Sequence, residues 1–139
     1  MNNQLFNSAL KKFNEKNFIE SKKLFEQLLS IEPKNFKAMH ALGVVNGILK
    51  NHQAALSLFR QSLSLNKDFE PSIYNLATSL FETGQYEESI ELFNKLLKKK
   101  QDDPNILLNY ANCLVKLGRF DEAINHYQSS LNINPNQFT

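Results

Sequence analysis

The sequence predicts an all-α fold built from helical hairpins that repeat every 34 residues. Three observations predict it: four columns keep one residue character at this spacing, apolar residues follow a helical period, and turn-forming residues recur between the helical runs. The columns hold aromatic residues (Phe25, Phe59, Phe93, Tyr127), leucines (Leu29, Leu63, Leu97, Leu131) and two sets of small residues (Ala9, Gly43, Ala77, Ala111; Ser21, Ala55, Ser89, Ala123). A fixed period of this length is typical of a stacked array rather than a globule with a buried active site, which favours binding over catalysis.

Four repeats account for almost the whole chain, and we expect them to form a single array over residues 1–139. The repeats are 2–35, 36–69, 70–103 and 104–137. Each is predicted to be a helix, a short turn and a second helix. The small-residue columns let the two helices approach closely, and the aromatic column fills the space beside them.

The first helix of each repeat is predicted from apolar residues at helical spacing. In the fourth repeat these are Leu107, Tyr110, Ala111, Leu114 and Leu117. Gly84 and Gly118 follow such runs, and glycine readily takes a positive φ at a helix end. The first two repeats place Lys16-Asn17 and Lys50-Asn51 there instead. Because asparagine tolerates the left-handed conformation, we expect these two turns to shift by one residue.

The second helix of each repeat is predicted from a further apolar run. In the fourth repeat it holds Phe120, Ala123, Ile124, Tyr127 and Leu131. Pro33 and Pro135 end the second helices of the outer repeats, whereas Pro71 and Pro104 open first helices, where proline is tolerated. Asp102-Asp103 are expected to form a turn and cap before Pro104.

Composition excludes several classes of function. The net charge of +2 is too small to predict a nucleic-acid partner. No stretch approaches the ~20 apolar residues of a membrane span, and the first residues hold no signal-peptide core. Cys113 is the only cysteine, so an internal disulfide cannot form, and a reducing, cytoplasmic compartment is expected.

The sequence contains no pattern that predicts catalysis. His40, His52 and His126 stand in different repeats without ligand-like spacing, so we expect no metal. The four glycines are scattered and form no phosphate-binding loop. Cys113 is expected to pack between helices. We therefore expect this chain to need no cofactor and to be no enzyme by itself, while a longer parent protein stays open.

These residues resemble the tetratricopeptide repeat, whose pattern has small residues at positions 8 and 20, aromatics at 17 and 24, and proline near 32. Phe18, Tyr86 and Phe120 fill position 17, and His52 departs from it. The segments 75–77 (Asn-Leu-Ala) and 118–123 (Gly-Arg-Phe-Asp-Glu-Ala) are close to the family consensus. The resemblance implies a right-handed superhelical solenoid of four repeats and eight helices, whose first helices line a concave groove that binds peptides or proteins.

Family geometry implies which residues face that groove. They are Phe6, Asn7, Leu10, Phe13, His40, Val44, Tyr74, Asn75, Thr78, Phe81, Leu108, Asn109, Asn112 and Lys116. Apolar and amide side chains with few charges suit an extended or helical peptide. Lys37 is the only cation at positions 2, 5 and 6, which disfavours the C-terminal carboxylate of heat-shock chaperones as a ligand.

Asn7, Asn75 and Asn109 form a column that Ala41 interrupts. An amide can hold a peptide bond by both its N–H and its C=O group. The column resembles the asparagine ladder in the repeats of protein N-acetylglucosaminyltransferases. The alternative is that these asparagines only cap or solvate their helices.

The two ends of the array differ. The first repeat has polar residues where its siblings are mostly apolar, as a terminal repeat requires: Ser8, Lys11, Lys12 and Glu15. The fourth keeps Ile124 and Leu131 apolar, so we expect a natural start near Met1 and further chain beyond Thr139. Three functional hypotheses follow: a peptide-binding scaffold, a recruitment module of a larger glycosyltransferase or sulfotransferase, and a self-assembly module that uses the uncapped fourth repeat.

Overall fold

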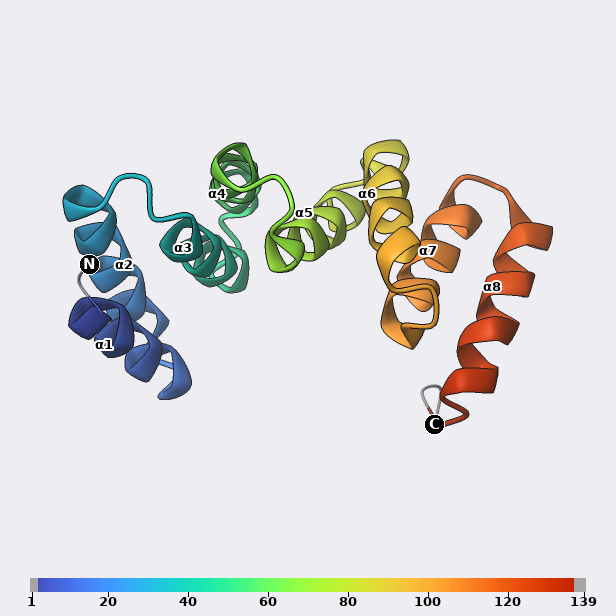
Figure 1. The fold of residues 1–139 in the computed structure, drawn as a ribbon, viewed down its shortest axis with the longest axis horizontal. Coiled ribbons are helices and arrows are strands. Elements are labelled where there is room, and N and C mark those ends of the chain that lie inside the picture. Colours follow the sequence, from blue (N-terminus) through green and yellow to red (C-terminus); the bar gives the residue numbers. More distant parts are fainter. Residues whose placement is uncertain (1–2, 137–139) are drawn as a thin grey trace. The chain divides into compact units, whose positions relative to one another are not determined.

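The computed structural model describes residues 3–136, and all regular structure in this range is helical. The helices are α1 (Asn3–Asn14), α2 (Phe18–Ile31), α3 (Phe36–Ile48), α4 (His52–Leu65), α5 (Glu70–Glu82), α6 (Tyr86–Lys99), α7 (Pro104–Lys116) and α8 (Phe120–Ile133) (Figure 1). Within the described range, no helix combines the length and apolar character that crossing a bilayer requires. The predicted all-α class is confirmed.

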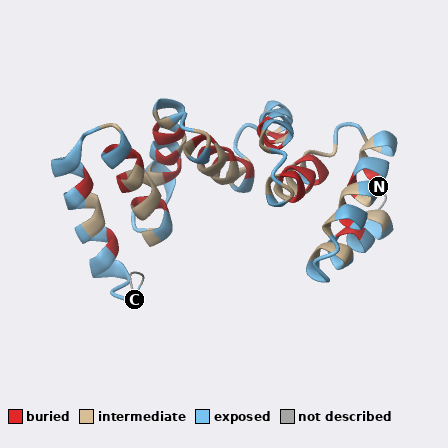
Figure 2. Cartoon of the chain, turned by 180° about the vertical axis from the view of Figure 1, so that it is seen from behind, coloured by how far each residue is buried: buried red, intermediate tan, exposed pale blue. Residues whose placement is uncertain are grey.

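Two compact units divide the chain within α5. The first runs to Asn75 and the second begins at Leu76. In the first unit α1 packs against α2, α2 against α3, and α3 against α4. In the second unit α6 packs against α7, and α7 against α8. Figure 2 shows the buried residues in patches along the helices, with exposed residues on their other sides.

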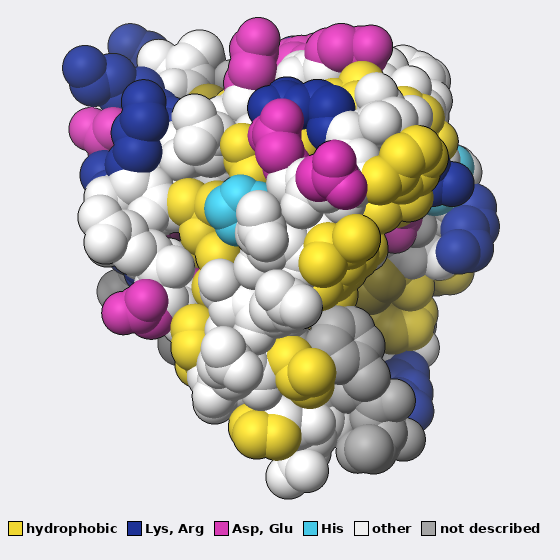
Figure 3. All heavy atoms as spheres, turned by 90° about the vertical axis from the view of Figure 1, so that its right-hand side faces the viewer, with side chains coloured by type: hydrophobic (Ala, Val, Ile, Leu, Met, Phe, Trp, Pro, Cys, Tyr) yellow, Lys and Arg dark blue, Asp and Glu magenta, His cyan; other side chains and the backbone are white. Residues whose placement is uncertain are grey.

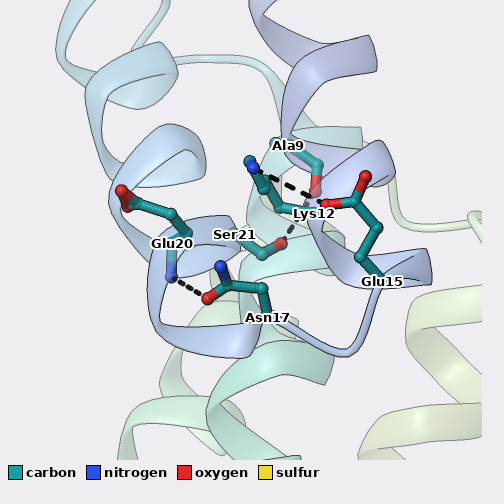
Figure 4. A network of polar contacts seen from close by, with 6 residues as sticks. All are labelled: Ala9, Lys12, Glu15, Asn17, Glu20 and Ser21. Carbon is teal, nitrogen blue, oxygen red and sulfur yellow. Dashed lines mark hydrogen bonds and ion pairs between the residues drawn. The ribbon is translucent and has the colours of Figure 1, made fainter.

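Serine hydroxyls join the two helices of each hairpin to the partner backbone. Ser21 Oγ donates to the carbonyl of Ala9 at 2.9 Å (Figure 4), and Ser89 Oγ donates to the carbonyl of Ala77 at 2.6 Å. The other two hairpins have alanine at this position and a serine seven residues later. There Ser62 Oγ donates to the Phe36 carbonyl at 3.0 Å, and Ser130 Oγ donates to the Pro104 carbonyl at 2.8 Å. Each hairpin therefore has one serine–carbonyl hydrogen bond beside its small residues. The serine stands at position 20 of the repeat in the first and third hairpins and seven residues later in the second and fourth.

The aromatic column lies inside the hairpins. Phe25, Phe59 and Phe93 are almost fully buried. Tyr127 is half-buried, and its hydroxyl donates to Asn112 Oδ1, so this pair links α8 to α7. The aromatic side chains thus fill the space beside the small residues, as the sequence predicts.

The turns inside the hairpins correct one prediction. Lys16 and Lys50 themselves adopt positive φ values of 61° and 66°, at the repeat position where Gly84 and Gly118 have 82° and 76°. The turn does not shift onto the following asparagines. Asn17 has a φ of −89° and caps the start of α2, where its Oδ1 accepts from the backbone N–H of Glu20 at 3.3 Å. The expectation was wrong: the left-handed residue is the lysine in both turns, and in the first of them the asparagine caps the next helix instead.

Polar caps and proline begin the first helices of two repeats. Asn35 Oδ1 accepts from the Ala38 N–H at 3.0 Å at the start of α3. Asp103 Oδ1 accepts from the N–H groups of Asn105 and Ile106 at 3.0 and 3.2 Å, and Pro104 is the first residue of α7. The cap predicted before Pro104 is confirmed, with Asp103 as the capping residue.

The last described helix has an uncovered apolar side. Phe120, Ile124 and Leu131 of α8 are 60%, 52% and 41% exposed. Ile90, which occupies the position of Ile124 in the preceding hairpin, is buried. Figure 3 faces the side of the molecule where α8 lies and shows hydrophobic side chains at the surface. By contrast Ser8 and Lys11 are exposed polar residues of α1, and exposed Glu15 follows its end.

Candidate functional site: an apolar pocket in the first unit

Within the first unit, a pocket of about 310 Å³ opens over α1 and α3. Its lining comes from α1, α2, α3 and the segment before α5: Phe6, Leu10, Phe13, Phe25, Lys37, His40, Ala41, Val44 and Phe69. The structure brings together here five residues that the sequence analysis assigns to the groove, namely Phe6, Leu10, Phe13, His40 and Val44. The pocket is predominantly apolar.

Aromatic rings in edge contact build its walls. The centroids of Phe6 and Phe25 lie 5.6 Å apart at an interplanar angle of 73°. Phe69 contacts His40 at 5.5 Å and 89°, and Phe36 at 5.1 Å and 73°. Edge-to-face pairs of this geometry are favourable and hold the rings in place.

Sequence reasoning missed two of the lining residues. Phe25 was assigned to the hairpin interior, where it is indeed fully buried, yet one side of its ring also borders the pocket. Phe69 was not singled out. Its position carries the helix-capping residues Asn35 and Asp103 in other repeats. The signal that could have identified Phe69 is that an aromatic residue stands where other repeats have a helix-capping Asn or Asp.

A chain of hydrogen bonds holds His40 in the pocket wall. Ser62 Oγ donates to the Phe36 carbonyl at 3.0 Å, which leaves its oxygen to accept from Ser72 Oγ at 2.8 Å. Ser72 Oγ lies 3.1 Å from His40 Nδ1, so Nδ1 carries the proton and donates to it. His40 Nε2 then accepts, and Asn75 Nδ2 lies 3.5 Å from it. Both ring nitrogens of His40 are therefore engaged by the protein.

Burial favours the uncharged form of His40. Desolvation lowers the pKa of the His40 imidazole below its ordinary value, because the charged form loses its hydration. A proton added to Nε2 would also face the amide donor of Asn75. The sequence analysis expected His40 as a groove residue, and the structure adds that its polar atoms point to Ser72 and Asn75.

Lys37 is the only charged residue among those that line the pocket. It lies in the first turn of α3 and is exposed. A second hollow, of about 870 Å³, shares Phe6 and Lys37 with the pocket. The remaining residues around that hollow are Asn3, Glu32, Pro33, Lys34, Asn35 and Phe36. The two hollows therefore adjoin at Phe6 and Lys37.

The other predicted groove residues lie outside this pocket. Asn7 is exposed on α1, and Tyr74 is half-buried at the start of α5. In the second unit they lie on α5 (Thr78, Phe81) and α7 (Leu108, Asn109, Asn112, Lys116). Two of them are engaged by their own hairpin: Phe81 contacts Tyr86 at 5.4 Å, and Asn112 accepts from Tyr127. Of the asparagines in the predicted ladder, Asn75 lies 3.5 Å from His40 Nε2 and is thus engaged within the protein.

Metal-ligand clusters and the single cysteine were the candidate catalytic features, and the described residues allow both to be assessed. Residues 3–136 contain no cluster of three or more His, Cys, Asp or Glu side chains that could hold a metal ion. Cys113 is fully buried, and burial raises the pKa of its thiol. The Ser89 hydroxyl lies 3.4 Å from its sulfur. Cys113 therefore packs between helices as a protonated thiol.

Comparison with solved structures shows related folds at low sequence identity. MamA from Desulfovibrio magneticus RS-1 is 14% identical and superposes with a TM-score of 0.91 over 96% of this chain and 75% of that chain. MamA AMB-1 is 19% identical, with a TM-score of 0.82 over 92% and 70%. YrrB, described as a TPR protein with an unusual peptide-binding site, is 16% identical, with a TM-score of 0.86 over 96% and 69%. These matches show the fold predicted from the sequence, an all-α solenoid of helical hairpins.

Comparison with family profiles assigns the chain. No curated protein matches it. The profile described as "Tetratricopeptide repeat" matches residues 49–107 and again residues 80–138. The two matches together cover more than half of the sequence, and they agree with the consensus segments 75–77 and 118–123. The chain belongs to the tetratricopeptide repeat family.

Proposed function

We propose that this chain is a protein-interaction module whose first-unit pocket binds an apolar side chain of a peptide or protein ligand. The observation that carries the proposal is the aromatic and aliphatic lining of the pocket of about 310 Å³ over α1 and α3. Binding sites are typically concave and mostly apolar, with a few polar groups that fix orientation. Membership of a family of interaction modules supports the same reading.

The size of the pocket limits the binding free energy that one inserted side chain can contribute. Fully burying a Leu, Phe or Met side chain is worth about 1.5–3 kcal/mol. Association itself costs several kcal/mol, so one inserted side chain gives only weak binding. The neighbouring hollow of about 870 Å³, which meets the pocket at Phe6 and Lys37, offers room for the residues on one side of the anchor.

A display experiment tests the proposal directly. A random dodecapeptide phage library is selected on the wild-type protein, and enriched clones are assayed on Leu10→Glu and Ile19→Glu variants. Leu10 lines the pocket and is 37% exposed, whereas Ile19 on α2 is 58% exposed and does not line it. We expect clones rich in Phe, Leu, Ile or Met that bind the wild type and Ile19→Glu but lose binding to Leu10→Glu.

The opposite pattern would refute the proposal. If no clone is enriched, or if clones bind Leu10→Glu as well as Ile19→Glu, the pocket is not a ligand site. Circular dichroism shows whether both variants keep the helical content of the wild type. Since both replaced side chains are partly exposed, we expect both variants to fold.

The uncovered side of α8 favours a second candidate, self-association. Exposed apolar patches on otherwise polar proteins often mark interaction sites. Phe120 and Ile124 are more than half exposed there. Light scattering across protein concentration tests this candidate with Ile124→Asp against Ile19→Asp. A mass that rises with concentration in the wild type and Ile19→Asp, but not in Ile124→Asp, supports it, and a constant monomer mass in all three excludes it.

A further inference from the structure

We infer that the first-unit pocket selects peptides in which an acidic side chain stands close to the apolar anchor. The inference rests on the proposed function, because it names the ligand class of the same pocket. The geometry points to Lys37 as the group that makes the selection. Among the described residues that line the pocket it is the only charged one, and it also borders the adjoining hollow.

The charged residues that line the adjoining hollow include more lysines than carboxylates. The adjoining hollow holds Lys34 and Lys37 against a single carboxylate, that of Glu32. The Glu32 carboxylate already accepts a hydrogen bond from Asn35 Nδ2 at 2.9 Å. Lys37 also lies in the first turn of α3, where the helix dipole adds positive potential. A basic residue of the ligand would be repelled by the positive charge of these lysines, whereas an acidic residue would be attracted.

His40, the other polar residue that lines the pocket, does not select the charge of the ligand. His40 directs Nδ1 to Ser72 and Nε2 to Asn75, so its ring offers the ligand an apolar face. The remaining lining residues are Phe, Leu, Val and Ala. The bottom of the pocket therefore recognises apolar volume, and charge is recognised only at the rim.

The electrostatic part of the selection is modest. Exposed ion pairs change an equilibrium by about twofold to fivefold. Because Lys37 is solvent-exposed, the preference should fade at about 1 M salt, where the Debye length falls to about 3 Å. Binding of the apolar anchor should persist at the same salt concentration.

The same phage selection separates this inference from the proposed function. The peptides are fused to the coat protein at their C-termini, so the only carboxylates offered are those of Asp and Glu side chains. Selections are run in parallel on the wild type, on Lys37→Glu, and on Lys23→Glu, which makes the same charge change on the exposed surface of α2. The best wild-type peptide is then synthesised with an amidated C-terminus, and its Kd is measured with each acidic residue replaced by the matching amide.

We expect Asp or Glu within three residues of the anchor in clones from the wild type and from Lys23→Glu. Lys or Arg should replace them in clones from Lys37→Glu. The acid-to-amide peptide should bind the wild type about twofold to fivefold more weakly. If Leu10-dependent clones show no acidic preference, or keep it on Lys37→Glu, the inference is wrong and the proposed function stands. If no clone depends on Leu10, both are wrong.

Discussion

Replacing Gly43 by Ala should destabilise the protein, although alanine is the better helix former. Gly43 is buried in α3, and alanine stands at the equivalent position of the other hairpins, Ala9, Ala77 and Ala111. A Cβ atom added at Gly43 would lie 2.6 Å from Cε1 and 2.9 Å from Cδ1 of Phe59. Separations this short are not sustained, so the ring or the helix must move.

The magnitude follows from two opposing terms. Replacing glycine by alanine inside a helix gains about 1 kcal/mol. Inserting a methyl group into a packed interior costs about 1–3 kcal/mol. Phe59 is almost fully buried and its ring also contacts His40 at 5.7 Å, so it has little room to yield. We expect a net change between about zero and 2 kcal/mol of destabilisation.

Gly47 supplies a matched control in the same helix. A Cβ atom added there meets nothing within 4 Å, so Gly47→Ala should stabilise by about 1 kcal/mol. The difference between the two variants then isolates the contact with Phe59. Urea unfolding followed by circular dichroism measures both, with thermal shifts of about 3–5 °C per kcal/mol for a chain of this size.

A double variant tests the cause. In a Phe59→Leu background the clash disappears, so Gly43→Ala should become as favourable as Gly47→Ala. Equal stabilisation by Gly43→Ala and Gly47→Ala in the wild-type background would refute the reasoning. It would mean that Phe59 rearranges freely despite its burial.

Three further outcomes can be measured by the same unfolding assay. Ser89→Ala should lower the free energy of unfolding by about 1 kcal/mol, since it removes the bond to the Ala77 carbonyl, and an unchanged midpoint would contradict this. Lys50→Gly should raise it by about 0.5–1 kcal/mol because glycine accepts the positive φ of 66° without strain, whereas no gain would show that the turn is relaxed. Burial lowers the pKa of His40 in the folded state below its unfolded value of about 6.5, so its contribution to stability should be complete above that pH and decrease as the pH falls through the folded pKa. His40→Gln should reduce this slope, and an identical slope in the variant would contradict the assignment.

Most of the fold could be predicted from the sequence because the residues that form the hairpins recur. Phe25, Phe59 and Phe93 share one environment, and their common spacing is enough to locate it. The left-handed conformation of Lys16 and Lys50 was missed, because lysine carries no local signal for it.

The candidate site was less predictable from the sequence, because some of its contacts occur in only one repeat. Family geometry placed Phe6, Leu10 and Val44 on one surface, and the structure brings them around one pocket. It did not indicate that Asn75 would turn towards His40, since that contact requires a histidine 35 residues earlier and occurs only once. Side-chain partners that do not repeat leave no periodic trace in a sequence.

Positions that vary between the repeats therefore account for the pocket. At the sixth position Ala41 replaces the asparagine of the other repeats, and at the ninth Val44 replaces the larger Leu10. Both smaller side chains belong to α3 and line the pocket opposite the phenylalanines of α1. Smaller side chains at these two positions fill less of the space between the helices than an asparagine or a leucine would. The pocket therefore lies where this repeat departs from its siblings, whereas the residues shared by the repeats pack the hairpin interiors.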